Sequence, residues 1–326
     1  MEPEFQSALQ PGLDQLNKKV MQIKREIGKV VVGQEKIIDL ILAGVFTGGH
    51  VLLEGVPGIA KTMTAKLMAR ALSIGFSRIQ FTPDLMPTDV TGTSVFNMRT
   101  SEFTFSKGPV FANLVLIDEI NRAPAKTQAS LFEVMEERQI TVDGTTYAMS
   151  FPFLVIATQN PIEQEGTYRL PEAQLDRFLF RLKLVYPSLD QEIEILKRFR
   201  NDFGTKVMDS VNPVISTQDL KEAQELIEKI HVEDAILSYI AKLIDSTRNN
   251  GDLVLGASPR ASLAIMRAAK AIAAMSGRDF VTPDDVKYVA HPVLNHRIML
   301  TAEREMEGIE AEDIIKEITD RLEIPR

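Results

Sequence analysis

The stretch GVPGIAKT, residues 55–62, follows an apolar run at 50–54 and opens a segment with helical periodicity. It departs once from the phosphate-binding loop G-x-x-x-x-G-K-[ST], because Ala60 stands where the last glycine is usual. A strand that ends in such a loop and leads into a helix presents N–H groups and a favourable dipole to an anion. A left-handed non-glycine residue costs only about 1–2 kcal/mol, so Ala60 does not exclude phosphate binding. The other interpretation of this stretch is a tight strand-to-helix turn.

Several residues of this loop have an expected part in a nucleotide site. Lys61 would reach the outer phosphates, and the hydroxyl of Thr62 would bind Mg²⁺. Pro57 lacks an N–H group but stiffens the loop. The residues expected to contact the nucleotide are Gly55, Val56, Pro57, Gly58, Ile59, Ala60, Lys61 and Thr62.

A second apolar strand ends in two adjacent acids, Asp118 and Glu119. Asp118 at the strand tip can hold Mg²⁺ through its water shell, and Glu119 can polarise an attacking water. Asn160 ends another apolar strand and would orient that water. Paired acids also occur in solvated loops, and asparagine also forms turns. The position of these residues in the same parallel sheet as Lys61 favours the catalytic interpretation.

Two arginines fall at the ends of predicted elements. Arg177 follows Asp176, and a surface salt bridge between them is the plain explanation. Arg260 lies in a helix start where Ser258 is placed to cap and Pro259 to open the helix. A cation in a first helical turn opposes the macrodipole, so we expect an anion beside Arg260, and a phosphate is a good candidate.

The order of segments predicts an α/β part followed by a helical part. The first 187 residues alternate strand-like and helical segments, which is typical of a mostly parallel sheet covered by helices. Hairpins at 93–108 and 139–149 interrupt this alternation. Helical segments with serine, threonine or proline start signals follow, so we expect domains at 1–187 and 188–326. The five expected strands lie at 50–55, 78–81, 113–119, 153–160 and 179–187.

The first hairpin carries Phe103 and Phe105, which either contact a partner or simply pin the hairpin.

Composition narrows the classes of protein. The chain has 326 residues and a net charge of −8, which argues against a surface built for nucleic acid. It has no cysteine, which excludes disulfides and thiolate metal sites and fits a cytoplasmic location. No apolar run approaches 18 residues, so we expect no membrane insertion.

The segments GVPGIAKT, VLIDEINRAP, ATQNP and LPEAQLDRF, in this order and spacing, resemble the AAA+ ATPases and specifically the MoxR family of the helix-2-insert clade. The resemblance runs from about Val31 to Leu294. The loop of that family often reads Gly-x-Pro-Gly-x-Ala-Lys-Thr, so Ala60 matches the family. The resemblance implies a five-stranded parallel sheet in the order 5-1-4-3-2, with the two hairpins as inserts that face the pore of a ring, and an all-helical lid.

The resemblance also implies roles for single residues. Lys61 and Thr62 correspond to Walker A, Asp118 and Glu119 to Walker B, and Asn160 to sensor 1. Arg177 resembles the arginine finger offered to the neighbouring subunit, and Arg260 resembles sensor 2, which acts in its own subunit or in the neighbour. Val32 and Gly33 are similar to the segment that packs against adenine.

The implied function is ATP hydrolysis with Mg²⁺ at the interfaces of a homo-oligomer, a hexameric ring formed with ATP. Such a protein would remodel, assemble or mature client proteins, including metal or cofactor insertion, often with a partner that carries a von Willebrand factor A domain. One alternative is a ring motor on nucleic acid, against which the acidic balance counts. Another is a nucleotide-dependent switch with little turnover, against which the intact pair Asp118 and Glu119 counts. A small-molecule P-loop kinase would need neither Arg260 nor a helical lid.

Overall fold

A computed structural model describes residues 3–56, 58–160, 168, 170–200 and 208–325, with side chains from residue 8 onward. The first part holds α1 (Pro3–Gly28), α2 (Glu35–Thr47), β1 (His50–Glu54), α3 (Lys61–Ala71), β2 (Phe76–Gln80), α4 (Pro87–Thr91), β3 (Gly92–Asn97), β4 (Glu102–Lys107), β5 (Leu114–Asp118), the 3-10 turn η1 (Ile120–Arg122), α5 (Ala125–Glu137), β6 (Gln139–Val142), β7 (Thr145–Ala148), β8 (Leu154–Gln159), α6 (Glu172–Leu175) and β9 (Phe178–Lys183). The second part holds α7 (Leu189–Phe199), α9 (Thr217–Glu228), α10 (Asp234–Arg248), β10 (Leu253–Leu255), α11 (Pro259–Met275), α12 (Pro283–Leu294), β11 (Met299–Leu300), α13 (Ala302–Met306) and α14 (Ala311–Arg321).

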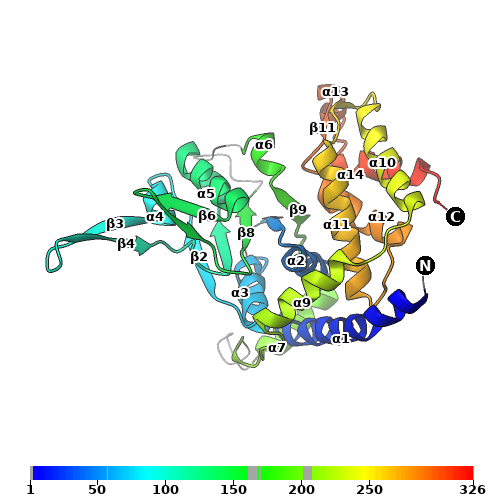
Figure 1. The fold of residues 1–326 in the computed structure, drawn as a ribbon. Helices are drawn as coiled ribbons and strands as arrows, with labels where there is room; N and C mark the ends of the chain where they lie inside the picture. The colour runs from blue at the N-terminus through cyan, green and yellow to red at the C-terminus, as the bar shows by residue number, and fades with distance from the viewer. Residues whose placement is uncertain (1–2, 57, 161–167, 169, 201–207, 326) are drawn as a thin grey trace.

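Five parallel strands form the central sheet, in the order β2-β5-β8-β1-β9 (Figure 1). Counted along the chain, these are the five strands expected from the sequence, and their order is the expected 5-1-4-3-2. The last strand ends at Lys183, earlier than expected. The α/β fold class and the parallel sheet are therefore confirmed.

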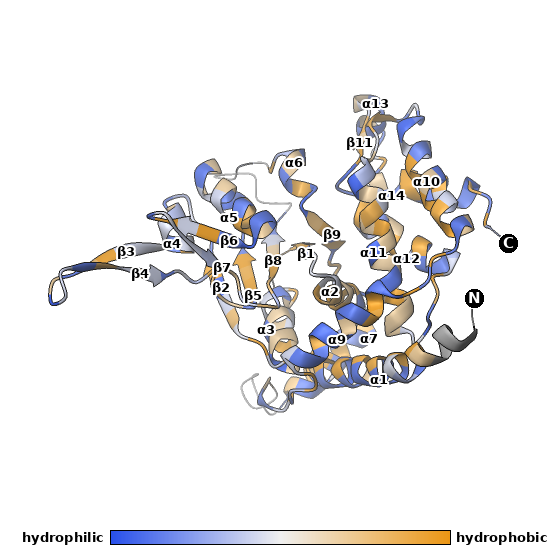
Figure 2. Ribbon diagram, in the orientation of Figure 1, coloured by the Kyte–Doolittle hydropathy of each residue, from blue (hydrophilic) through white to orange (hydrophobic). Residues whose placement is uncertain are grey.

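Alternate residues of the strands supply two apolar cores, because successive side chains point to opposite faces of a sheet. On β1, Val51 and Leu53 pack in the core that α1, α2 and α3 cover, whereas Leu52 packs in the core that α5 covers. The strands β5 and β8 in the middle of the sheet are accordingly mostly hydrophobic (Figure 2). Burial on both faces explains why these strands read as continuous apolar runs.

Two antiparallel hairpins extend from this body. β3–β4 projects away from the sheet (Figure 1), and β6–β7 turns at Asp143 and Gly144, with φ of 49° and 76°. Positive φ at both central residues is the geometry of a two-residue hairpin turn. The antiparallel pairing of β3 with β4 and of β6 with β7 shows that both predicted hairpins are present. The ring of Phe105 packs on Tyr147, with 4.6 Å between centroids, and joins the hairpins. Phe103 is 72% exposed, so Phe105 pins the hairpin and Phe103 faces solvent.

The helices of the second part begin at the expected signals. Ser188, Ser216 and Thr282 form capping boxes with residues three positions later. Ser258 also occupies an N-cap position, but its side chain makes no cap hydrogen bond, which corrects the expectation for α11. The antiparallel ribbon β10–β11 was not expected from the sequence. Over the described ranges, no helix combines the length and apolarity needed to cross a membrane.

The two parts pack closely on each other. Helix α11 contacts α1 and α2, and α9 lies along α1 and α2 (Figure 1). One apolar cluster runs from α1 through the sheet into α10, α11 and α12. The change from α/β to helical structure falls between β9 and α7, and the division into domains at 1–187 and 188–326 stays a prediction.

Candidate functional site

The predicted phosphate loop lies at the edge of the sheet where the parallel strands β1, β5 and β8 end. Helix α3 begins at Lys61, and the preceding residue, Ala60, has φ of 61° and ψ of 20°. Gly58 also has positive φ, at 87°. Ala60 therefore adopts the left-handed conformation that favours glycine, at a cost of about 1–2 kcal/mol. Pro57 lies outside the described residues.

A second segment of the chain holds the loop from the side. The amide Nε2 of Gln34 donates to the carbonyl of Ile59 at 3.1 Å. The same amide accepts, through Oε1, a hydrogen bond from Thr64 Oγ1 at 3.2 Å. Lys61 Nζ donates to the carbonyl of Gly55 at 2.5 Å, so its ammonium group lies over the loop. The loop is thus fixed by polar contacts to the segment before α2.

Asp118 and Thr62 meet across this edge. The side chain of Asp118 is 9% exposed, and its Oδ2 lies 3.5 Å from Thr62 Oγ1. Thr158 Oγ1 donates to Oδ1 of the same carboxylate at 3.2 Å. A hydroxyl and a carboxylate at this spacing are oxygen donors of the kind that Mg²⁺ prefers, so the residues present fit this ion.

Glu119 follows β5 in a left-handed conformation, with φ of 58°. Its backbone N–H donates to Thr158 Oγ1 at 3.0 Å. Its Oε2 accepts a hydrogen bond from Gln80 Nε2 at 2.7 Å and lies 3.1 Å from Arg122 Nε. The carboxylate is therefore held by polar partners at the rim of the site.

These residues surround one cavity, and a second cavity adjoins it. The first has a volume of about 370 Å³ and brings Asp118, Glu119 and Asn160 together with half of the predicted phosphate-loop residues. It is lined by Gly58, Ala60, Lys61, Thr62, Met63, Arg78, Gln80, Asp118, Glu119, Thr158 and Asn160. The second, of about 380 Å³, shares Gly58, Ala60 and Met63 with the first and is lined also by Val32 and Gly33. Its other walls include Val31 and Tyr186, so it presents apolar surface beside the loop.

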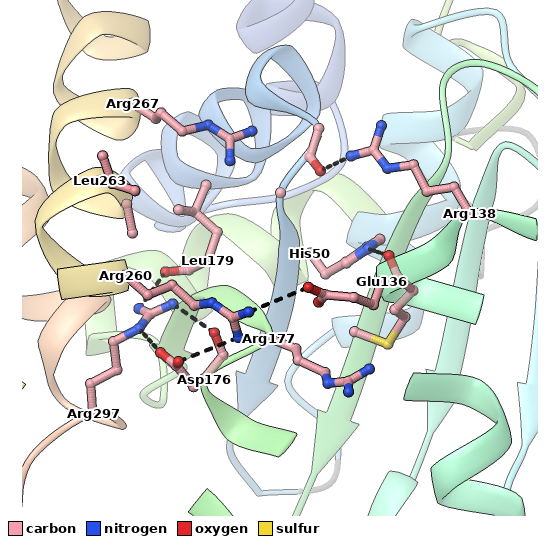
Figure 3. Close-up of a pocket in the computed structure, with 14 residues that line it drawn as sticks. His50, Glu136, Arg138, Asp176, Arg177, Leu179, Arg260, Leu263, Arg267 and Arg297 are labelled. Carbon is pink, nitrogen blue, oxygen red and sulfur yellow. Dashed lines mark hydrogen bonds and ion pairs between the residues drawn. The ribbon is translucent and has the colours of Figure 1, made fainter. Parts of the chain in front are cut away.

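Arg177 and Arg260 lie elsewhere, around a third cavity of about 350 Å³ (Figure 3). Arg177 directly precedes β9, which runs parallel to β1, and the first residue of β1, His50, lines the same cavity. This cavity is thus at the opposite edge of the sheet from the loop. Five strand residues at about 3.3 Å each separate the two edges by roughly 17 Å. The structure therefore does not bring these arginines to the loop of their own chain.

Ion pairs hold Arg260 in the third cavity. Its guanidinium lies 3.3 Å from Glu136 and 3.5 Å from Asp176 (Figure 3). Asp176 also pairs with Arg297 at 2.6 Å, and Arg177 donates to the carbonyl of Phe132. The expected pair of Asp176 and Arg177 is therefore replaced by pairs with Arg260 and Arg297. The anions expected beside Arg260 are these carboxylates.

Two buried basic groups belong to this edge. Arg297 has a side chain only 3% exposed, and burial lowers its pKa although Asp176 opposes the shift. Burial also lowers the pKa of His50 to about 4. His50 Nδ1 accepts from the backbone N–H of Val155 at 2.9 Å, and Nε2 donates to the carbonyl of Met135 at 3.1 Å. His50 is thus a neutral structural link between β1, β8 and α5.

Comparisons with known proteins match both parts of the chain. Residues 50–180 match the family model described as the ATPase family associated with various cellular activities (AAA), and residues 245–318 match the AAA lid domain. The chain is 44% identical over 310 residues to chaperone MoxR1 of Mycobacterium tuberculosis, covering 92% of this chain and 81% of that protein. The chain belongs to the MoxR family of AAA+ ATPases. Family membership makes it a nucleotide-binding ATP hydrolase of a chaperone-like kind.

Two further relatives support the MoxR assignment over the length of the chain. YeaC of Bacillus subtilis is 46% identical over 299 residues, covering 92% of each chain. A crystal structure of a protein from Cytophaga hutchinsonii, assigned as an ATPase, is 42% identical, with a TM-score of 0.90 and full coverage of both chains.

The sequence interpretation missed several residues of these cavities. Arg78 and Gln80 lie two positions apart on β2, so both side chains reach the face where β5 presents its acids. Their polar character near the end of a strand, beside the Walker B strand, was the available signal. Gln34 lies within VVVGQE, and Arg297 is 121 residues from Asp176, a separation that no local pattern bridges.

Proposed function

We propose that this MoxR-family protein hydrolyses ATP between the subunits of a ring and uses the reaction to remodel or assemble client proteins. One observation carries the proposal. The loop and acids lie at one edge of the sheet, and Arg177 and Arg260 lie at the other. A second copy of the chain would complete the site if it placed the sheet edge that carries Arg177 and Arg260 against the first cavity. Repeating this head-to-tail contact closes a ring, which we expect to be a hexamer.

Within one subunit, the first cavity would hold the triphosphate. Lys61 and the N–H groups at the start of α3 would bind the phosphates, and Val32 and Gly33 would contact the adenine. Thr62 and Asp118 would hold Mg²⁺. Bound there, the ion would neutralise phosphate charge during phosphoryl transfer. The positions of the side chains around the two adjoining cavities support these proposed roles.

Glu119 and Asn160 would act on the attacking water. Glu119 lies at the rim of the cavity and accepts hydrogen bonds, so it can take a proton from water. Asn160 is 7% exposed and lines the same cavity, where its amide can orient that water. General-base assistance of this type contributes about 10²–10⁴ in rate.

Arg177 and Arg260 would act on the nucleotide of the neighbouring subunit. They share one cavity, so we assign Arg260 the same direction of action as Arg177. The pair of Arg260 with Glu136 is about half exposed, and its pair with Asp176 is long at 3.5 Å, so both cost little to break. An arginine supplied to a transferring phosphoryl group is worth about 10³–10⁵ in rate in other enzymes.

A mixing experiment tests the shared site. Glu119→Gln and Arg177→Ala each inactivate every site of a uniform ring, and each variant alone should turn over poorly. In an equal mixture, an Arg177→Ala subunit supplies an intact cavity and its Glu119→Gln neighbour supplies an intact arginine. If subunits mix at random, roughly a quarter of the interfaces regain both parts, and ATPase activity should return accordingly. A mixture that co-assembles but stays as inactive as its parents would show that Arg177 does not act in the neighbouring site.

The motion that would couple hydrolysis to clients lies between the proposed domains at 1–187 and 188–326. The helical domain packs on α1 and α2 beside the loop, so a shift there can follow a change at the nucleotide. The projecting hairpin β3–β4 would face the pore and the client. On the basis of the family resemblance, the proposal also includes a partner with a von Willebrand factor A domain and a part in metal or cofactor insertion. Cytoplasmic location also belongs to it, because a chain without cysteine fits a reducing compartment.

A further inference from the structure

Arg78 contacts the Walker B carboxylate directly. It lies on β2, next to β5 in the sheet, and its side chain lines the first cavity together with Lys61 and Thr62. Its Nε donates to Asp118 Oδ2 at 2.6 Å, which is shorter than the contacts that Thr158 and Thr62 make with this carboxylate, at 3.2 and 3.5 Å. The side chain of Arg78 is 52% exposed, whereas that of Asp118 is 9% exposed. A solvent-facing cation therefore covers a buried acid.

This contact uses the oxygen that faces the proposed magnesium site. Arg78 and Thr62 both approach Oδ2 of Asp118, and Thr62 is the other proposed magnesium-binding residue. A guanidinium and a divalent cation at the same carboxylate repel each other, strongly where water is partly excluded. The observed position of Arg78 and a magnesium ion served by Asp118 are thus in competition.

We propose that Arg78 is the counter-ion of Asp118 while the site lacks nucleotide, and that it must leave this carboxylate before Asp118 can serve Mg²⁺. The inference rests on the proposed nucleotide site. Arg78 is then a positioning residue, because it acts through Asp118. Paired with Arg78, the buried acid has no uncompensated charge, and the site takes up Mg²⁺ readily only together with a nucleotide.

The cavity gives Arg78 a place to move. Its Nη2 already lies 3.4 Å from Gln80 Oε1, further along the same strand. A turn of the side chain toward Gln80 would release Asp118 while the guanidinium stays at the wall of the cavity. No change in the backbone of β2 is required for this movement.

The test is a magnesium titration of nucleotide binding. Binding of a fluorescent, non-hydrolysable ATP analogue is measured against free Mg²⁺ for the wild type, Arg78→Gln and Arg78→Lys. We expect the Mg²⁺ concentration for half-maximal binding to fall on the order of tenfold in Arg78→Gln, since a charged hydrogen bond to Asp118 no longer competes. Arg78→Lys keeps the charge and should stay near the wild type. Arg70→Gln is the matched control, because Arg70 is 40% exposed and pairs with Asp209 outside the cavity.

Each outcome decides a separate point. An unchanged or higher Mg²⁺ requirement in Arg78→Gln would overturn the proposal, since Arg78 would then merely support Asp118. If the wild type binds no analogue at any Mg²⁺ concentration, the proposed nucleotide site fails instead.

A thermal melt checks that the variants fold. Arg78→Met, which keeps the apolar stem, replaces Arg78→Gln if that variant unfolds. A titration of Mn²⁺ without nucleotide, followed by electron paramagnetic resonance, should show tighter binding in the uncharged variant, and equal binding would contradict the inference.

Discussion

Ala60 is a residue whose backbone energy and function can be separated. Its φ of 61° is unfavourable for alanine by about 1–2 kcal/mol, whereas glycine loses about 0.5–1 kcal/mol more chain entropy on folding. We therefore expect Ala60→Gly to raise the free energy of unfolding by about 0.5–1 kcal/mol and to retain ATP binding. Urea unfolding measures this change. Ala129→Gly on the exposed face of α5 is the control and should lower stability by about 1 kcal/mol. A loss of stability in Ala60→Gly would show that the methyl group contributes packing that outweighs the strain.

His50 makes stability depend on pH in a defined window. Its folded pKa is about 4 and its ordinary value is 6.5, so the unfolded chain binds the proton more readily. The stability linked to neutral His50 is complete above pH 6.5 and is lost as the pH falls toward 4, by about 3 kcal/mol in all.

This pH dependence can be isolated with matched variants. His50→Gln should be less stable than the wild type at pH 7, and the difference should shrink between pH 6.5 and 4, because glutamine has no proton to bind. His231, which is 55% exposed, provides the control variant His231→Gln. Unfolding free energies from urea titrations at several pH values give the comparison. A difference that stays constant across the window would mean that His50 is not held neutral by the fold.

At the level of residues, the sequence predicted which side chains lie together where their grouping depends on local order, whereas their roles stay predictions. Lys61, Thr62 and Asp118 were assigned from strand ends and loop spacing, and the structure places them around one cavity. Arg78 was not predicted as a site residue, because a charged residue on the edge strand β2 is expected to face solvent until its pairing with β5 is known. Arg297 was not predicted either, because its partner, Asp176, is close only after the helical part has folded against β9.

At the scale of elements, predictability followed burial. The strands β1, β5 and β8 in the middle of the sheet were visible as apolar runs because both faces of the sheet are covered there. The ribbon formed by Leu253–Leu255 and Met299–Leu300 was not predicted. Its strands are too short to show a hydrophobic period, and each forms only by pairing with the other. The hairpin β6–β7 was predictable for a different reason, namely the local conformational demand of its turn at Asp143 and Gly144.

The hairpin β3–β4 offers an element-level prediction. Phe103 is 72% exposed near its tip, whereas Phe105 packs on Tyr147 and Phe111 at the base. Phe103→Ser should leave the melting temperature and the basal ATPase rate unchanged, but reduce stimulation of the ATPase by a client protein. Phe105→Ser should instead lower the melting temperature, because it removes two aromatic contacts, each worth about 0.5–1.5 kcal/mol. Equal effects of the two variants on stability would contradict the different roles assigned to them.

At the scale of the whole molecule, carboxylates of the same chain pair with the arginines at the sheet edge opposite the phosphate loop. Glu136 and Asp176 hold Arg260, and Asp176 also holds Arg297, so the isolated subunit leaves little unpaired charge on these side chains. A neighbour's triphosphate offers a stronger anionic partner for Arg177 and Arg260 than these carboxylates do. Assembly should therefore depend on bound ATP, because the nucleotide contributes contacts to both subunits.

Sedimentation velocity tests this dependence. We expect Glu119→Gln to form the ring with ATP and Mg²⁺, because it binds ATP but hydrolyses it slowly, and to remain a smaller species with EDTA and no nucleotide. Arg177→Ala should raise the protein concentration needed for assembly on the order of tenfold, since one charged contact to phosphate is lost at each interface. Lys61→Ala, which removes the phosphate-binding ammonium group, should not assemble in response to ATP. Rings of equal stability with and without nucleotide would show that the subunit contact does not pass through the ATP site, and that the arginines reach the neighbour only after the ring has formed.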